Sequence, residues 1–293
     1  MRLKIVFSRD GTELFSAAED GTVRLWNTKI GELIVTLKGH SGAVTCCAIS
    51  IDGKRALSGG DDDTVRFWDL EKNEQLAEFK GHGTPIYAVA FAPGAKEAVS
   101  VASNHTIYRW NLDERKEVSH FTCGGIRASP NGRPNVLNML VAHISTDTGQ
   151  ALIPSYWGTV HLIDTKSQSE LGTFGAWGLR GIALSKDETL MACLSEHELT
   201  VWDVATRTQK AKLLGGNGGL RTVAFTGDGQ RLVVGASNQP TRVWDIESKA
   251  IIGELSEKSP AWTAVAVSAD GNWAASGEDK GKIFLWPLSW IDE

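Results

Sequence analysis

The sequence contains little of what several classes of protein require. Its longest apolar stretches have the length of a strand and fall far short of the roughly twenty residues that span a bilayer. Lysine and arginine form no dense run, and the formal net charge is -5, so nucleic acid is a poor expected partner. No signal-peptide pattern follows Met1. These absences predict a soluble, cytoplasmic chain that binds neither membrane nor nucleic acid.

Cysteine is scarce as well. The four cysteines, Cys46, Cys47, Cys123 and Cys193, show no C-x-x-C spacing. Cys46 and Cys47 fall in a predicted strand, where neighbouring side chains point to opposite faces, so they cannot hold one metal ion together. We interpret all four as reduced core cysteines. The sequence therefore predicts no metal and no cofactor.

Tryptophan, in contrast, is abundant and periodic. Six of the 11 tryptophans form two groups with steps of 42 residues: Trp26, Trp68 and Trp110, then Trp202, Trp244 and Trp286. Between the groups, Ile163 in Gly-Thr-Val-His-Leu-Ile-Asp takes the place of Trp26 in Gly-Thr-Val-Arg-Leu-Trp-Asn. The chain thus contains seven repeated units.

Each unit has the pattern of four short strands. In unit two, β-prone runs at residues 43–49, 55–58, 64–69 and 74–79 are separated by turns rich in glycine and aspartate. Such runs, about ten residues apart, predict antiparallel strands joined by tight turns. No segment has the pattern of a long helix, so the chain is predicted to be all-β.

Two dipeptides identify the repeat. Gly-His ends units one and two at residues 39–40 and 81–82, and Trp-Asp occurs at 68–69, 202–203 and 244–245. With these dipeptides and the 42-residue period, nearly the whole chain resembles the WD-repeat family. The resemblance implies that each unit is one blade of a propeller around a central channel. We therefore expect a seven-bladed β-propeller of four-stranded antiparallel blades.

This propeller is expected to be a single domain over residues 1–293. The expected blades span residues 1–38, 39–80, 81–122, 136–174, 175–214, 215–256 and 257–293, with a loop insertion at 122–135.

The resemblance also implies a buried network in blade two, made by His40, Ser58, Asp62 and Trp68. A histidine between a serine and an aspartate equally describes a hydrolase triad. The set recurs in phase with the repeat and includes the indole, and burial requires that such donors and acceptors be paired. These features favour a structural network over a catalytic one.

The network weakens along the chain. Blade three keeps His82, Ser100 and Trp110 but has Asn104 in place of the acid. Blade one has Ser16, Asp20 and Trp26, and no histidine precedes them. Blade six has Gly216, Val234 and Asn238 at the corresponding places. We expect the first three blades to be the best determined part of the fold.

The last blade is predicted to lack its outer strand. Aligning the Asp-Gly turns at residues 10–11 and 52–53 places the first strand at about residues 3–7, and few residues follow Trp286. A natural three-stranded blade and a segment of a longer protein both stay open as explanations. An open edge would accept an added strand, from another copy or from a partner, although residues 289–293 could form a short substitute edge.

The resemblance implies that loops entering the first strands and loops between second and third strands share the face that partners use most. The step from Trp110 to Ile163 is 53 residues, 11 longer than the period, and the excess falls in the turn-rich segment 122–135. Such an insertion either carries the specificity of partner binding or is a surface loop that the fold tolerates. Because aromatic and arginine side chains anchor interfaces, the candidate partner-binding residues are Tyr87, Arg127, Arg133, Trp157, Trp177, Arg180, Arg221 and Trp262.

The sequence therefore predicts a non-catalytic scaffold or recognition module of signalling type, with a protein or peptide as partner. The arginines favour an acidic or phosphorylated peptide. Two alternatives stay open: a propeller-housed enzyme of the hydrolase or lyase type, and a self-associating structural element. No metal-ligand cluster, phosphate-binding loop or acid–base pair stands outside the repeat pattern, so we expect no enzyme.

Overall fold

A computed structural model describes residues 3–123, 143–145, 148–155, 158–175, 178–195, 197–214, 219–255, 262–278 and 281–288. Within these ranges every regular element is a β-strand, which confirms the predicted all-β class. The described residues include no helix that could cross a membrane. The insertion predicted at 122–135 lies outside them from position 124 onward.

The first four blades are four-stranded sheets. Blade one contains β1 (Leu3–Phe7), β2 (Glu13–Ala18), β3 (Thr22–Asn27) and β4 (Leu33–Lys38). Blade two contains β5 (Val44–Ile49), β6 (Arg55–Gly60), β7 (Val65–Asp69) and β8 (Glu74–Phe79). Blade three contains β9 (Ile86–Phe91), β10 (Glu97–Ala102), β11 (Thr106–Asn111) and β12 (Lys116–Thr122). Blade four contains β13 (His143–Ile144), β14 (Gln150–Pro154), β15 (Thr159–Asp164) and β16 (Ser169–Gly175).

The remaining three blades follow the same order. Blade five contains β17 (Gly181–Leu184), β18 (Leu190–Leu194), β19 (Glu198–Asp203) and β20 (Gln209–Leu214). Blade six contains β21 (Leu220–Phe225), β22 (Arg231–Ala236), β23 (Arg242–Asp245) and β24 (Ala250–Glu254). Blade seven contains β25 (Trp262–Val267), β26 (Trp273–Glu278) and β27 (Ile283–Pro287). In the described residues, the last sheet has three strands, as predicted.

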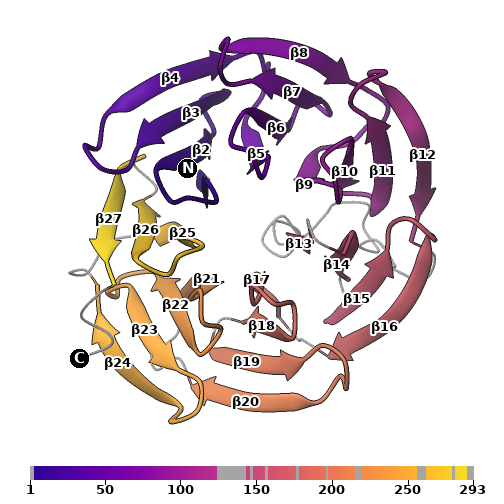
Figure 1. Ribbon diagram of the computed structural model, residues 1–293. Helices are drawn as coiled ribbons and strands as arrows, with labels where there is room; N and C mark the ends of the chain where they lie inside the picture. The colour runs from indigo at the N-terminus through magenta and orange to yellow at the C-terminus, as the bar shows by residue number, and fades with distance from the viewer. Residues whose placement is uncertain are drawn as a thin grey trace.

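The seven sheets stand side by side in a ring (Figure 1). The first strand of each blade lines the centre, and β4, β8, β12, β16, β20 and β24 form the outer rim. Consecutive strands within a blade are antiparallel hydrogen-bonded neighbours. Blade seven lies beside blade one, and β1 contacts β25. The seven-bladed propeller is therefore confirmed.

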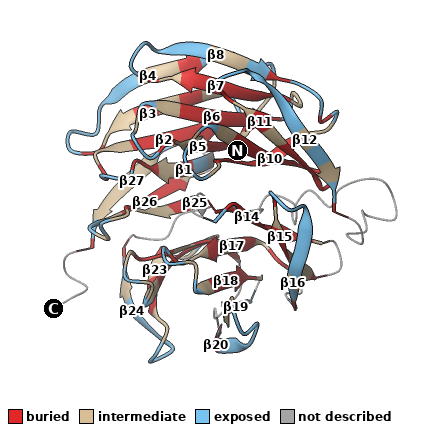
Figure 2. Ribbon diagram, turned by 45° about the vertical axis from the view of Figure 1, so that its right-hand side comes forward, coloured by how far each residue is buried: buried red, intermediate tan, exposed pale blue. Residues whose placement is uncertain are grey.

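The hydrophobic core lies between the blades. The second strands are almost fully buried, whereas the outer strands are largely exposed (Figure 2). Between blades two and three, Val65 and Phe67 pack with Ile86 and Phe91 in one apolar cluster. Because each blade buries its side chains against the next one, the ring is a rigid support for the loops at its two faces.

Candidate functional site

The connections between strands emerge on two opposite faces. Connections that lead into a first strand, and those that join second to third strands, lie on one face, which we call the top face. The other connections lie on the bottom face. There the side chains at the ends of the third strands, such as Asn27, Asp69 and Asp203, accept hydrogen bonds from backbone N–H groups of the following turn. The aspartate of Trp-Asp is thus a turn-forming residue.

In blade two, a hydrogen-bonded chain lies directly under the top face. The indole Nε1 of Trp68 donates to Ser58 Oγ at 2.9 Å, and Ser58 Oγ lies 2.8 Å from His40 Nε2. His40 Nδ1 lies 2.9 Å from Asp62 Oδ1. Because the Asp62 carboxylate can only accept, His40 donates to it from Nδ1. In a neutral imidazole Nε2 is then an acceptor, so the Ser58 hydroxyl donates to it. The chain links the loop before β5 to β6 and β7.

The electrostatics of this chain are those of a buried structural network. Burial lowers the pKa of His40, although Asp62 opposes that shift, so the imidazole is neutral at pH 7. Burial alone would raise the pKa of Asp62, but hydrogen bonds from His40 and the Ser41 N–H hold it below its usual range. Ser58 is 0% exposed, so a substrate cannot reach its hydroxyl. The triad interpretation thus has no accessible nucleophile.

Blade three forms part of the same network. His82 Nε2 lies 2.7 Å from Ser100 Oγ, which accepts from the Trp110 indole at 2.8 Å. Asn104 accepts from the Thr106 N–H at 3.0 Å. Within the described part of the chain, the buried Nδ1 of His82 has no hydrogen-bond partner. Burial lowers the pKa of His82 to about 3, so this imidazole is neutral as well.

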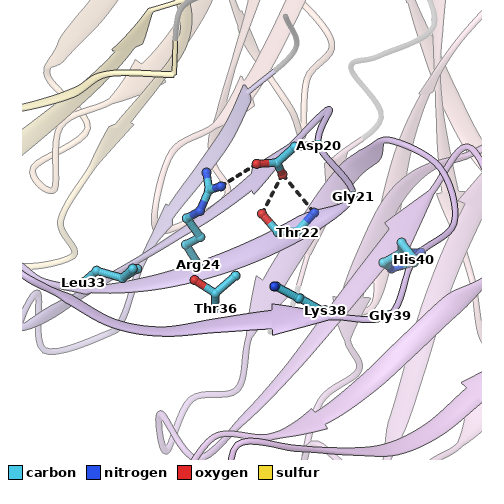
Figure 3. A pocket seen from close by; sticks show the side chains of 9 residues that line it. All are labelled: Asp20, Gly21, Thr22, Arg24, Leu33, Thr36, Lys38, Gly39 and His40. Atoms are coloured by element: carbon cyan, nitrogen blue, oxygen red, sulfur yellow. Dashed lines mark hydrogen bonds and ion pairs between the residues drawn. The ribbon is translucent and has the colours of Figure 1, made fainter.

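Blade one has the indole and serine contact without a histidine. The Trp26 indole donates to Ser16 Oγ at 2.9 Å. Asp20 accepts from the Thr22 N–H and hydroxyl and forms an ion pair with Arg24 (Figure 3). A pocket of about 760 Å³ lies beside these residues. Sequence reasoning identified Ser16, Asp20 and Trp26 but not this pocket, because the pocket depends on how β3, β4 and their adjoining loops pack together.

Two of the candidate partner-binding arginines lie next to one another on the top face. Arg180 immediately precedes β17, and Arg221 is the second residue of β21. A Cβ placed on Gly181 would lie 3.6 Å from the Arg221 carbonyl oxygen, so the two segments are in contact. Arg180 is half-buried, whereas Arg221 is exposed, and its Nε donates to Ser237 Oγ at 2.9 Å. Blades five and six thus bring together the two backbone segments that carry these arginines.

The other candidate partner-binding residues do not join Arg180 and Arg221 in a described site. Tyr87 is 8% exposed and lines the central channel, so it offers little surface to a partner on the top face. Tyr87 is therefore not an exposed anchor of a partner-binding face, because its side chain is packed within the ring. First strands are not buried throughout, since Arg221 of β21 is exposed. Trp262 is the first residue of β25, and only its backbone is described. Arg127, Arg133, Trp157 and Trp177 lie outside the described residues.

The central channel contains no catalytic set among the described residues. It has a volume of about 430 Å³ and is lined by first strands from all around the ring. Alanines make up much of its wall, and its charged lining residues are Lys4, Arg9 and Lys186, with no carboxylate or histidine among them. The described residues also contain no group of metal-ligating side chains. An acid–base pair is therefore absent from this lining.

Fold and network together define a seven-bladed propeller of the WD-repeat class. Over residues 2–287 the chain matches the family model described as the IFT122 first beta-propeller. The chain belongs to this family.

A second similarity is to Transducin-like enhancer protein 2 of Mus musculus, which is 34% identical over 95 residues. The match covers 30% of this chain and 12% of the mouse protein, so the chain spans only a small part of that relative. The family match is to a propeller, a class of generally non-enzymatic protein-interaction modules. That general role is the one that the comparisons support.

Proposed function

We propose that this propeller is a non-catalytic recognition module that binds an acidic or phosphorylated segment of a partner protein on its top face. The observation that carries the proposal is the adjacent pair Arg180 and Arg221, with the exposed Arg221 guanidinium held by Ser237. Guanidinium groups bind carboxylates and phosphates through paired, charge-assisted hydrogen bonds. Arg180 and Arg221 are the anchors of the proposed site.

The charge distribution over the top face supports this location. The chain is acidic overall, with a formal net charge of -5. On blades one and two, the top-face loops carry Asp20 and the run Asp61–Asp63. These carboxylates repel an acidic segment from one side of the face, while the arginines attract it to blades five and six. Complementary and repulsive charges on one face fix the orientation of a ligand.

The test is a peptide array in which each sequence appears with serine, phosphoserine or glutamate at its centre. The wild-type chain is compared with an Arg180→Glu/Arg221→Glu variant and with a Lys29→Glu/Lys72→Glu variant. The control changes the net charge equally at exposed lysines on the bottom face. We expect the arginine variant to lose at least tenfold in affinity for the selected phosphopeptides and the control to bind as the wild type does. Equal binding by both variants would show that the site is wrong.

A further inference from the structure

Arg221 is the extra residue of a β-bulge at the start of blade six. The residues on either side of it pair with consecutive residues of β22, so Arg221 itself has no partner in the ladder. In blades two and three the extra residues are Thr45 and Tyr87. Thr45 donates to the Gly59 carbonyl at 3.0 Å, and Tyr87 is 8% exposed, so both side chains stay within the ring. In blade six the bulge instead carries an exposed, charged side chain.

Ser237 holds the Arg221 guanidinium in one orientation. Ser237 follows β22, and its backbone N–H donates to the Gly219 carbonyl at 2.8 Å, which ties the turn to the segment before β21. Its Oγ accepts from Arg221 Nε at 2.9 Å. Among the described residues, the two terminal nitrogens of Arg221 have no hydrogen-bond partner. Because Nε is occupied, the edge formed by the two terminal nitrogens is left for a ligand.

The sequence of the turn explains why the Ser237 hydroxyl is available. In blade five, Ser195 occupies the same repeat position, seven residues before the tryptophan. Its Oγ accepts from the Glu198 N–H at 3.1 Å and donates to the Glu198 carbonyl at 3.2 Å. The residue equivalent to Glu198 in blade six is Pro240, which has no N–H to donate. The serine of blade six is therefore free of this turn contact and binds Arg221 instead.

Arg221 and Ser237 together offer three donors to an anion. Two are the terminal nitrogens of Arg221, which bind two oxygens as a pair. The third is the Ser237 hydroxyl, because it accepts from Nε through a lone pair and keeps its own hydrogen to donate. No acceptor for that hydrogen is found in the described part of the chain. A carboxylate has two oxygens, whereas a phosphate monoester has three terminal oxygens and a charge of about -1.5 to -2 at pH 7.

We propose that Arg221 and Ser237 form a phosphate-monoester site, in which the guanidinium binds two phosphate oxygens and the hydroxyl donates to the third. The ligand is a phosphorylated side chain of a partner protein. The assignment rests on the recognition role proposed above and narrows it, because it makes a phosphate rather than an aspartate or glutamate side chain the preferred ligand. Ser237 is also the positioning residue for Arg221.

The probe is N-acetyl-phosphoserine amide, and N-acetyl-glutamate amide is the carboxylate for comparison. Titrations follow the Nε–H nuclear magnetic resonance signal of Arg221 in isotope-labelled protein, a signal identified by its loss in Arg221→Lys. We expect saturable shifts with the phosphoserine compound and about tenfold weaker binding of the glutamate compound. This comparison uses the wild-type chain and needs no variant that could fail to fold.

Removal of the hydroxyl tests the role of Ser237. Ser237→Ala keeps the backbone bond to Gly219, and it should weaken binding of the phosphoserine compound about tenfold and reduce its preference over the glutamate compound. Ser237→Thr keeps a hydroxyl and should retain that preference. Ser195→Ala removes the equivalent serine of blade five, whose hydroxyl serves its own turn, and is the matched control.

Three results would overturn the phosphate site: no saturable shift of the Arg221 signal, equal affinity for the two compounds, or equal effects of Ser237→Ala and Ser195→Ala. The recognition role is tested separately. If phosphopeptides selected on the array need the arginines but bind Ser237→Ala as they bind wild type, the recognition role stands and the phosphate site is wrong. An array without such peptides would refute the recognition role, and with it a protein as the ligand, whatever the titration shows.

Discussion

His40 lies two residues after the outer strand of blade one, and its Nδ1 stands 2.9 Å from Asp62 Oδ1 in blade two. The contact therefore joins two consecutive blades as well as pairing two polar groups. Both side chains are nearly inaccessible, at 1% and 6% exposed. Since a buried polar group is costly when its partner is removed, this link contributes to the stability of the ring more than an exposed pair would.

Removal of the imidazole tests that contribution. We expect His40→Ala to lower the free energy of unfolding by about 1 to 3 kcal/mol, because Ser58 and Asp62 would lose their shared partner in a buried place. Guanidinium denaturation measures the change. His197→Ala, at an exposed histidine, is the control and should leave stability within about 0.5 kcal/mol of wild type. An unchanged midpoint for His40→Ala would contradict the structural role of the network.

Blade three offers the converse experiment. The buried His82 Nδ1 has no acceptor among the described residues, and Asn104 stands where blade two has Asp62. We expect Asn104→Asp to supply the acceptor and to raise the free energy of unfolding at pH 7 by about 0.5 to 1.5 kcal/mol. Asn73→Asp adds the same charge in an exposed turn and should have no such effect. A stabilisation shared by both variants would instead indicate a general effect of charge.

The neutral His82 makes stability depend on pH. Burial lowers its pKa to about 3 from 6.5, so between these values the unfolded state binds a proton that the folded state does not. The contribution of the neutral His82 to the free energy of unfolding is complete above pH 6.5. It decreases by about 1.4 kcal/mol for each pH unit as the pH falls towards 3. Denaturation series between pH 6.5 and 4 should show a shallower slope for His82→Gln than for wild type. The His197→Gln control should keep the wild-type slope; equal slopes for all three chains would refute the shifted pKa.

Close approach of neighbouring blades gives a fourth prediction. A Cβ on Gly59 would lie 2.6 Å from Ile86 Cγ2 and 2.8 Å from Cys46 Sγ, and Ile86 is fully buried. We expect Gly59→Ala to destabilise the protein by about 1 to 3 kcal/mol, because β9 must move away from β6. Gly175 has open space around its Cβ position, so Gly175→Ala should be tolerated. Thermal unfolding of the two variants compares them directly, and equal melting temperatures would argue against the close approach.

Much of the architecture was predictable from the sequence because its signals are local. Alternating apolar residues, Asp-Gly turns and the tryptophan period specify short strands and their number without knowledge of any distant contact. The three-stranded last blade followed from the same alignment of turns. The serine partners of Trp68 and Trp110 followed from the resemblance to the WD-repeat family, and each lies ten residues before its tryptophan.

Which residues are accessible to a partner could be determined only from the folded ring. Tyr87 has the chemistry of an interface residue but is buried in the channel wall, whereas Arg221, also the second residue of a first strand, is exposed. The contact of Gly181 with Arg221 and the ion pair of Arg24 with Asp20 depend on how adjacent blades or side chains meet. No period in the sequence encodes those distances.

The sequence by itself determined the all-β class and the number of repeated units, because repetition places equivalent residues in equivalent environments. The residues of the buried network followed from the resemblance to the WD-repeat family. Only the tertiary structure decided which of them are accessible and where the ring departs from its own repeat. Val65 of blade two is fully buried, whereas Ile283, at the equivalent position of blade seven, is half-buried. That difference in burial depends on how each blade packs against its neighbours, which the repeat alone does not specify.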